Sequence, residues 1–167
     1  MNDTFYTDES GTATLSTELK VGDYKLHEVK SASGYALDSK PVPFKVDGSV
    51  ATVVVEKTNI AQKGRISILK QGDMFVSVNT NGEFYEPVFG LTGLMGAEYE
   101  ITAAEDIMTA DGTIRAKKGE VVSTLTTDKN GFAESDLLYL GKYEIAEVTA
   151  PFGFVKNDTI QTVELVY

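Results

Sequence analysis

The sequence predicts an all-β protein built from tandem antiparallel β-sandwiches, and two observations carry this prediction. Short segments rich in β-branched and aromatic residues alternate apolar with polar positions, and small turn residues separate them. One motif also occurs twice, 119 to 120 residues apart, which is the size of a small domain rather than of a solenoid unit. With 167 residues, 42% of them hydrophobic, the chain has apolar material for one large or two small cores.

The predicted strands are short and follow one another with turn residues between them. In chain order they are 42–46, 51–55, 65–70, 98–102, 121–126, 142–148 and 162–167. The dipeptides between them tolerate positive φ: Asp47-Gly48, Asn81-Gly82, Asp111-Gly112, Lys118-Gly119 and Asn130-Gly131. Residues 103–108 are expected to form at most one helical turn, and residues 58–64 a short linker. Strands at this spacing indicate a sandwich.

The repeated motif places a carboxylate on an apolar strand face. Residues 22–35 return as residues 141–154, and each copy follows a Thr-Asp-x-x-Gly-x-Ala turn, at 7–13 and at 127–133. Since alternate residues of a strand share a face, Glu28 lies on the apolar face of the first copy and Glu147 on that of the second. A glutamate among core residues is the main sequence clue to chemistry.

Composition excludes several classes of function. A net charge of −10 and a pI near 4.5 disfavour binding to nucleic acid or to anionic lipid headgroups. No apolar stretch is long enough to span a bilayer, and the N-terminus lacks a basic segment followed by an apolar one. The chain has no Cys and a single His, so disulfides, thiolate chemistry and multi-histidine metal sites are excluded. We expect no cofactor and no metal.

The motifs resemble the Cna-type B domain, also called the SpaA-like prealbumin-like domain, of Gram-positive pilins and surface adhesins. The resemblance is most specific in the second module, over 65–70, 96–101, 127–131 and 141–154. It implies two prealbumin-like, Ig-related sandwiches: residues 1–60, lacking their N-terminal strands, and residues 64–167, lacking their last strand. The first copy departs from the family by having Ser33 where proline is usual.

The resemblance also implies a covalent chemistry. In many such domains a lysine on the first strand is joined to an asparagine or aspartate on the last, promoted by the glutamate of the motif. Lys70 and Glu147 match the lysine and glutamate positions in the second module, and Glu28 and Asn59 match the glutamate and acceptor positions in the first. The partner of each pair would lie outside this chain, so no closed bond is expected within it. Burial lowers the pKa of a lysine and raises that of a glutamate, which suits such a reaction.

Simpler explanations of these residues stay open. A lysine at a strand end commonly extends its ammonium to water, and the glutamates could pair with a nearby lysine or tyrosine hydroxyl. The alternation around Asn59 also puts Lys57 on the same face.

The expected function is that of a stalk or spacer module of an extracellular, cell-wall-anchored adhesin or pilin, whose signal peptide and sorting signal lie outside this sequence. Its partners would be neighbouring modules of the parent protein or strands supplied head to tail by another molecule. The alternative is a binding module for a carbohydrate or host protein, on loops within 73–89 where Phe75, Phe84, Tyr85 and Phe89 are concentrated. A turnover enzyme is not expected beyond a single autocatalytic bond formation.

Overall fold

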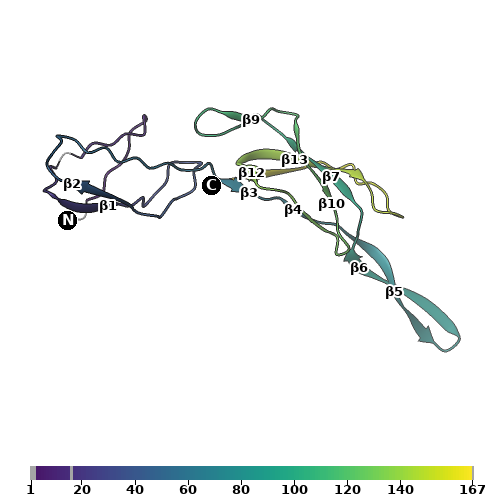
Figure 1. Cartoon of the computed structure of the whole chain (residues 1–167). Coiled ribbons are helices and arrows are strands. Elements are labelled where there is room, and N and C mark those ends of the chain that lie inside the picture. The colour runs from purple at the N-terminus through teal and green to yellow at the C-terminus, as the bar shows by residue number, and fades with distance from the viewer. Residues whose placement is uncertain (1–2, 16, 167) are drawn as a thin grey trace. The chain divides into compact units, whose positions relative to one another are not determined.

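A computed structural model describes residues 3–15 and 17–166, and every regular element in them is a β-strand (Figure 1). The all-β class predicted from the sequence is therefore confirmed. The chain separates into two compact units, here called unit 1 (the described residues within 1–31 and 37–59) and unit 2 (those within 32–36 and 60–167). The described part of the chain contains no helix with the length and hydropathy of a membrane span.

Unit 1 contains one antiparallel pair of strands, β1 (Gly22–Leu26) and β2 (Val42–Val46). Tyr24 and Phe44 lie opposite each other in this pair, and their rings stack with centroids 5.5 Å apart. The strand predicted at 51–55 is wrong, because in the described chain this segment has no neighbouring strand with which to form a ladder. Its alternation nevertheless persists, since Val55, Lys57 and Asn59 are half-buried and the residues between them are exposed.

Unit 2 is a sandwich of two β layers from which a long hairpin extends (Figure 1). One layer is the four-stranded sheet β10-β7-β13-β14, and the other consists of the pairs β11-β4 and β12-β3; β8-β9 and β5-β6 form separate two-stranded sheets. The strands are β3 (Lys63–Gly64), β4 (Ser67–Leu69), β5 (Gln71–Asn81), β6 (Phe84–Gly93), β7 (Glu98–Ala103), β8 (Ile107–Met108), β9 (Ile114–Ala116), β10 (Val121–Thr126), β11 (Phe132–Glu134), β12 (Leu138–Tyr139), β13 (Gly141–Thr149) and β14 (Gln161–Leu165).

The core of unit 2 lies between these layers. Alternate residues of β7 point inward, as the period of a half-buried strand requires, and they meet apolar side chains from the opposite layer. The buried cluster comprises Ile66, Ile101, Ala103, Ile107, Ala116, Leu125, Ala133, Leu138 and Tyr143. This core fixes the positions of β4, which ends just before Lys70, and of β13, which contains Glu147.

Two segments differ from or refine the sequence prediction. Residues 103–108 contain the end of β7 and the short strand β8 in place of the predicted helical turn. The aromatic segment 73–89 does not form loops but most of the β5-β6 hairpin, because its apolar alternation is punctuated by the Asn81-Gly82 turn. Gly82 has a φ of 66°, and the glycines of the other four predicted turns also have positive φ.

Candidate functional site

The two copies of the motif have the same strand register. In unit 1, Gly22 pairs with Val46, and in unit 2, Gly141 pairs with Leu165, so that each partner lies 119 residues after its counterpart (22 to 141, 46 to 165). The repeat found in the sequence is thus a repeat of structure. It brings the two glutamates to equivalent positions. Glu28 lies just after the end of β1, and Glu147 lies within β13.

In unit 2, the side chains of Lys70 and Glu147 form a close ion pair. Lys70 Nζ lies 2.8 Å from Glu147 Oε1 and donates a hydrogen bond to Oε2 over 3.0 Å. The side chain of Glu147 is 2% exposed and that of Lys70 is 16% exposed. The backbone N–H of Asn157 donates a second hydrogen bond to Glu147 Oε2, over 2.7 Å. The carboxylate that strand parity placed on the apolar face therefore lies inside the sandwich, and it contacts the lysine that the family resemblance indicated.

The backbone around Lys70 is held on both sides. Ile66 is buried and Ile68 packs against the core, so the same strand face carries Lys70 inward. The N–H of Lys70 donates to the carbonyl of Gly131, and the carbonyl of Lys70 accepts a bond from the N–H of Leu94. The amine therefore extends from a fixed point toward Glu147.

A cavity of about 170 Å³ opens beside this ion pair. It is lined by Ser67, Ile68, Leu69, Tyr99, Ile145, Glu147, Asn157, Thr159 and Gln161. Tyr99 on β7 lies directly opposite Glu147 on β13 in the antiparallel register. Burial raises the pKa of the Tyr99 phenol, and the negative charge of Glu147 raises it further. The phenol therefore remains a neutral hydroxyl next to the ion pair.

Tyr99 is a site residue that the sequence reasoning did not identify. The signal was present, because Tyr99 and Ile101 alternate within the predicted strand 98–102 and must share its inward face. What the sequence did not provide was the pairing of β7 with β13, which places Tyr99 opposite Glu147.

In unit 1, Glu28 binds the amide of Asn59. Asn59 Nδ2 donates to Glu28 Oε2 over 2.8 Å, and the backbone N–H of Asp38 donates to the same oxygen over 2.8 Å. Asp38 follows Glu28 by ten residues, as Asn157 follows Glu147. Each glutamate thus accepts an equivalent backbone hydrogen bond, but the two bind different side chains, and Glu147 is buried whereas Glu28 is half-buried.

Lys57, which shares a face with Asn59, has other partners. Its Nζ lies 2.8 Å from Asp38 Oδ2 and donates to the carbonyl of Lys40 over 2.8 Å. The hydrogen bond from Lys57 lowers the pKa of the Asp38 carboxyl, which favours the carboxylate. Lys57 is thus occupied by an ordinary ion pair.

The structure brings the predicted residues together as two separate pairs. Glu147 and Lys70 belong to unit 2, and Glu28 and Asn59 belong to unit 1. Among the described residues no group of three or more His, Asp or Glu side chains is arranged to hold a metal ion.

An amine held against a buried carboxylate beside an open cavity has a defined chemical capacity. The carboxylate can accept a proton from the amine, and the free amine can then attack a carbonyl carbon placed in the cavity. The amide held by Glu28 in unit 1 has the complementary capacity, since a carboxamide carbon is a target for such an amine. Lys70 and Asn59 thus carry the two kinds of group, an amine and a carboxamide, that such a reaction would join, and each contacts a glutamate of its own unit.

One solved structure supports this fold. The chain is similar to the Bacillus anthracis TIE protein, with 28% identity and a TM-score of 0.61, over 95% of this chain and 25% of that one. A streptococcal ancillary pilin matches with 21% identity and a TM-score of 0.39, over 89% of this chain and 39% of that one. This chain thus spans about a quarter of the length of the first of these two structures. No curated protein gives a significant match.

A family model also matches. The SpaA model, described as a prealbumin-like fold domain, matches residues 1–61 and 90–166. The segment between these ranges contains β4, Lys70 and most of the β5-β6 hairpin. Since the matched ranges make up more than half of the sequence, the chain belongs to the SpaA family of prealbumin-like fold domains.

Proposed function

We propose that this chain is a stalk or spacer segment of a Gram-positive cell-surface protein, an adhesin or a pilin, strengthened by covalent bonds between side chains. The observation that carries the proposal is the Lys70–Glu147 pair, with Nζ and Oε1 2.8 Å apart beside an open cavity. Membership of the SpaA family and the likeness to the Bacillus anthracis TIE protein support the surface role. The function is mechanical, since a tie between strands resists their separation.

The reaction in unit 2 is a single amide exchange. Lys70 first gives a proton to Glu147, and its neutral amine then attacks the side-chain carbonyl carbon of an asparagine that enters the cavity, so that a new C–N bond forms. Glu147 takes the proton released by the amine and delivers it to the departing nitrogen, which leaves as ammonia. With a protonated aspartic acid in place of asparagine, the leaving group is water. Each site reacts once, so this is not turnover catalysis.

The incoming asparagine is expected to lie on an added strand. In the described chain β4 pairs only with β11, and β14 pairs only with β13. Unpaired strand edges on both sides of the cavity provide backbone groups that an extended segment can bind. A neighbouring module of the parent protein or another molecule would supply this segment.

In unit 1 the roles are proposed to be reversed: the unit supplies the asparagine, and the lysine comes from elsewhere. Its glutamate already holds the amide of Asn59, so the missing group is a lysine amine. Asn59 is bound to Glu28, and Lys70 is bound to Glu147. A bond between Asn59 and Lys70 would therefore separate one of these two residues from the glutamate that holds it. Both sites are therefore expected to react with segments outside these units.

A peptide that carries the asparagine tests this proposal. The chain itself contains a suitable sequence, residues 50–61, with Asn59 near its end. Incubated with the whole chain, this peptide should form an adduct whose intact mass is the sum of both masses minus about 17 Da. The Lys70→Arg variant, the Glu147→Gln variant and a peptide with Asn59→Ala should form none. Absence of the adduct with the unmodified chain, or its survival in Lys70→Arg, would contradict the proposal.

A second candidate function is ligand binding by the β5-β6 hairpin. It is favoured by the exposure of aromatic side chains on this hairpin, among them Phe84 and Tyr85. Recognition of a carbohydrate or of a host matrix protein would fit an adhesin. A glycan array and binding to immobilised matrix proteins would reveal this function, whereas a pure spacer would bind neither.

A further inference from the structure

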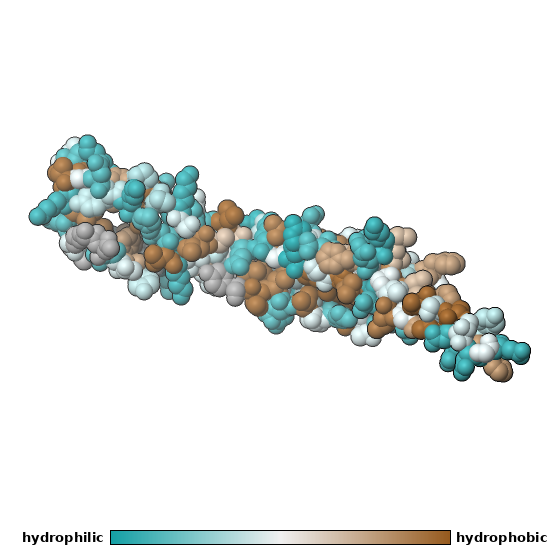
Figure 2. Space-filling model, turned by 90° about the horizontal axis from the view of Figure 1, so that it is seen from below, coloured by the Kyte–Doolittle hydropathy of each residue, from teal (hydrophilic) through white to brown (hydrophobic). Residues whose placement is uncertain are grey.

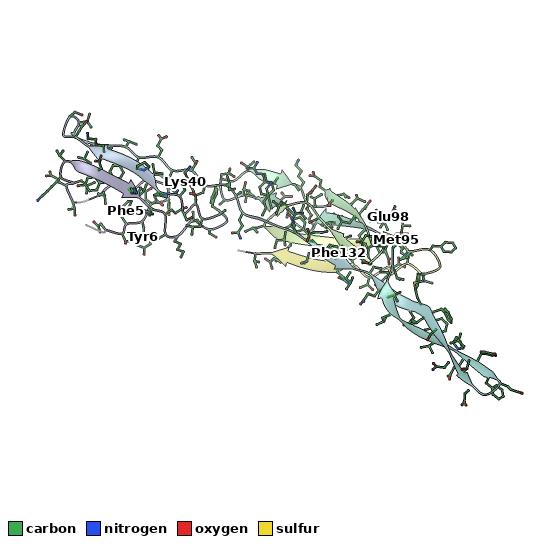
Figure 3. All side chains as sticks on the ribbon, turned by 60° about the horizontal axis from the view of Figure 1, so that its bottom comes forward. Phe5, Tyr6, Lys40, Met95, Glu98 and Phe132 are labelled. Carbon is green, nitrogen blue, oxygen red and sulfur yellow. The ribbon has the colours of Figure 1, made fainter. Side chains whose placement is uncertain are left out.

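The β5-β6 hairpin is an addition to the sandwich rather than a part of it. It forms a two-stranded sheet of its own and extends from the sandwich of unit 2 with no other ribbon of that unit beside it (Figures 1 and 3). Most of it lies outside the ranges that match the family model. A two-stranded hairpin that buries no face against a sheet gains little stability from its apolar residues. Its apolar content therefore calls for another explanation.

One face of this hairpin is apolar. In the antiparallel register Phe75 lies opposite Phe89, Val78 opposite Pro87, and Thr80 opposite Tyr85, which places their side chains on one face. The exposed apolar members of this face are Phe75, Val78, Tyr85, Phe89 and Leu91, and each has at least 45% of its surface exposed. The opposite face is mixed: Met74, Phe84 and Val88 lie on it together with the polar side chains of Ser77, Asn79, Asn81 and Glu86. Figure 2 shows apolar residues gathered on the hairpin next to the sandwich and a hydrophilic tip.

The hairpin base is fixed to the sandwich. A Cβ on Gly72 would lie 2.6 Å from a Leu94 side-chain carbon and 2.7 Å from the Phe154 ring, so the backbone is packed directly against these side chains. A Cβ on Gly93 would overlap the carbonyl of Asn130. Met95 and Phe132 lie at this end of the sandwich (Figure 3). Because its base is fixed, the apolar face needs less ordering on binding.

The charges of the hairpin all have one sign. Residues 71–93 contain Asp73, Glu83 and Glu86 and no Lys, Arg or His. Asp73 lies opposite Leu91 and therefore on the apolar face, near the base, while Glu83 lies in the turn at the tip. A second copy would bring like charges together, in a chain whose net charge is already −10. A neutral carbohydrate could donate hydroxyl hydrogen bonds to these carboxylates but would gain no charge attraction from them, whereas a cationic partner gains both.

We propose that the apolar face of the β5-β6 hairpin binds a basic polypeptide segment of a partner protein. Apolar side chains of the partner pack on Phe75, Phe89 and Leu91, and its Lys or Arg side chains lie over the aromatic rings and reach the carboxylates of Asp73 and Glu83. The stems of Lys and Arg add apolar contact of their own. This inference names the partner class for the second candidate function and does not depend on the covalent bond, because Lys70 takes no part in it.

A pair of synthetic peptides tests the partner class. One twelve-residue peptide alternates Lys with Val and Tyr, and the other has Glu in place of each Lys. We expect the lysine peptide to bind the whole chain and to shift the NMR signals of residues 73–91, and the glutamate peptide to bind at least tenfold more weakly. Equal binding of both peptides, no binding of either, or binding of neutral glycans to the hairpin in their place would overturn the proposal.

Matched variants separate the hairpin from the general negative charge of the chain. The Asp73→Asn/Glu83→Gln double variant should weaken binding of the lysine peptide by about tenfold, and so should Tyr85→Ser/Phe89→Ser. The Glu144→Gln/Glu164→Gln variant removes the same number of charges from exposed positions on β13 and β14 and should bind as the unmodified chain does. If this control weakens binding as much as the hairpin variants do, the attraction is non-specific and the proposal is wrong. All four hairpin side chains changed in these variants are exposed, so unchanged thermal unfolding is expected. Because cross-linking is measured separately by mass, failure of one proposal leaves the other testable.

Discussion

The turn that begins each repeat is built in the same way in unit 1 and unit 2, whereas the interiors behind the two turns differ. Asp8 Oδ1 accepts hydrogen bonds from the N–H groups of Ser10 and Thr12, and Asp128 Oδ1 accepts them from those of Asn130 and Phe132. These contacts span at most four residues, so the local sequence determines them. They form whether or not the rest of the unit is well packed.

A tyrosine that occurs at the same place in both repeats shows how the packing of the two units differs. Tyr24 OH donates to the carbonyl four residues before it, and Tyr143 OH does the same. Tyr143 is 1% exposed, yet Tyr24 is only half-buried. All the buried hydrophobic residues found in the described chain belong to unit 2. The reason is topological, since β13 has β7 on one side and β14 on the other, while among the described residues β1 pairs only with β2.

The largest consequence of this difference should be in stability. Amide hydrogen exchange of β1 and β2 is expected to be about a thousandfold faster, relative to intrinsic rates, than that of β7 and β13, which corresponds to about 4 kcal/mol in opening free energy. A two-stranded sheet without a buried core opens easily. Exchange measured by NMR at neutral pH would check this, and similar protection in both units would show that unit 1 is stabilised by something other than a core.

The two glutamates sharpen the comparison. Glu147→Ala should destabilise unit 2 by about 3 kcal/mol, because it leaves the largely buried ammonium of Lys70 without its carboxylate. Glu28→Ala should cost about 1 kcal/mol, since Glu28 is half-buried and loses neutral hydrogen-bond donors. Urea unfolding followed by fluorescence or NMR would measure both.

A control variant isolates the ion pair from the other contacts of Glu147. In Lys70→Met the ammonium is absent, so adding Glu147→Ala to it should cost less than Glu147→Ala does in the unmodified chain. Equal costs would mean that the ion pair contributes nothing.

The sequence predicted the parts of the site that depend on strand parity. The inward direction of Lys70 and of Glu147 follows from their apolar neighbours two residues away, and the repeat doubled the evidence for the glutamate. The backbone bonds from Asp38 and Asn157 were not predictable, because they depend on the path of a ten-residue connection that has no periodic pattern. The prediction of a strand at 51–55 was wrong for a related reason. Alternation indicates which side of a segment is apolar, but it does not indicate whether a second strand lies beside the segment to form a ladder with it.

The buried tyrosine gives a test of pH dependence. Burial raises the pKa of Tyr143 to about 12, above the ordinary value of 10, so the folded state favours the neutral phenol. Its contribution to stability is fully present below pH 10 and is lost as the pH rises toward 12. We expect the stability of unit 2 to fall by about 2 kcal/mol over this range and Tyr143→Phe to remove most of the fall. Tyr24→Phe is the matched control, and it should leave the alkaline transition of unit 2 unchanged.

The smallest expected effect is in the acidic turns, where the two units should behave alike. Hydrogen bonds from Ser10 to Asp8 lower the pKa of that carboxyl, and backbone hydrogen bonds from Phe132 and Asn130 lower the pKa of Asp128. A lowered pKa in the folded state means that each carboxylate stabilises its turn at neutral pH, and that this contribution is lost as the pH falls below the ordinary value of 3.8. NMR titration should therefore place both carboxyls below 3.8, and Asp8→Ala and Asp128→Ala should each reduce protection of their own turn. If Asp8 titrated at its ordinary value while Asp128 did not, the turn of unit 1 would need a packed interior to form. The conclusion that local sequence alone determines both turns would then be wrong.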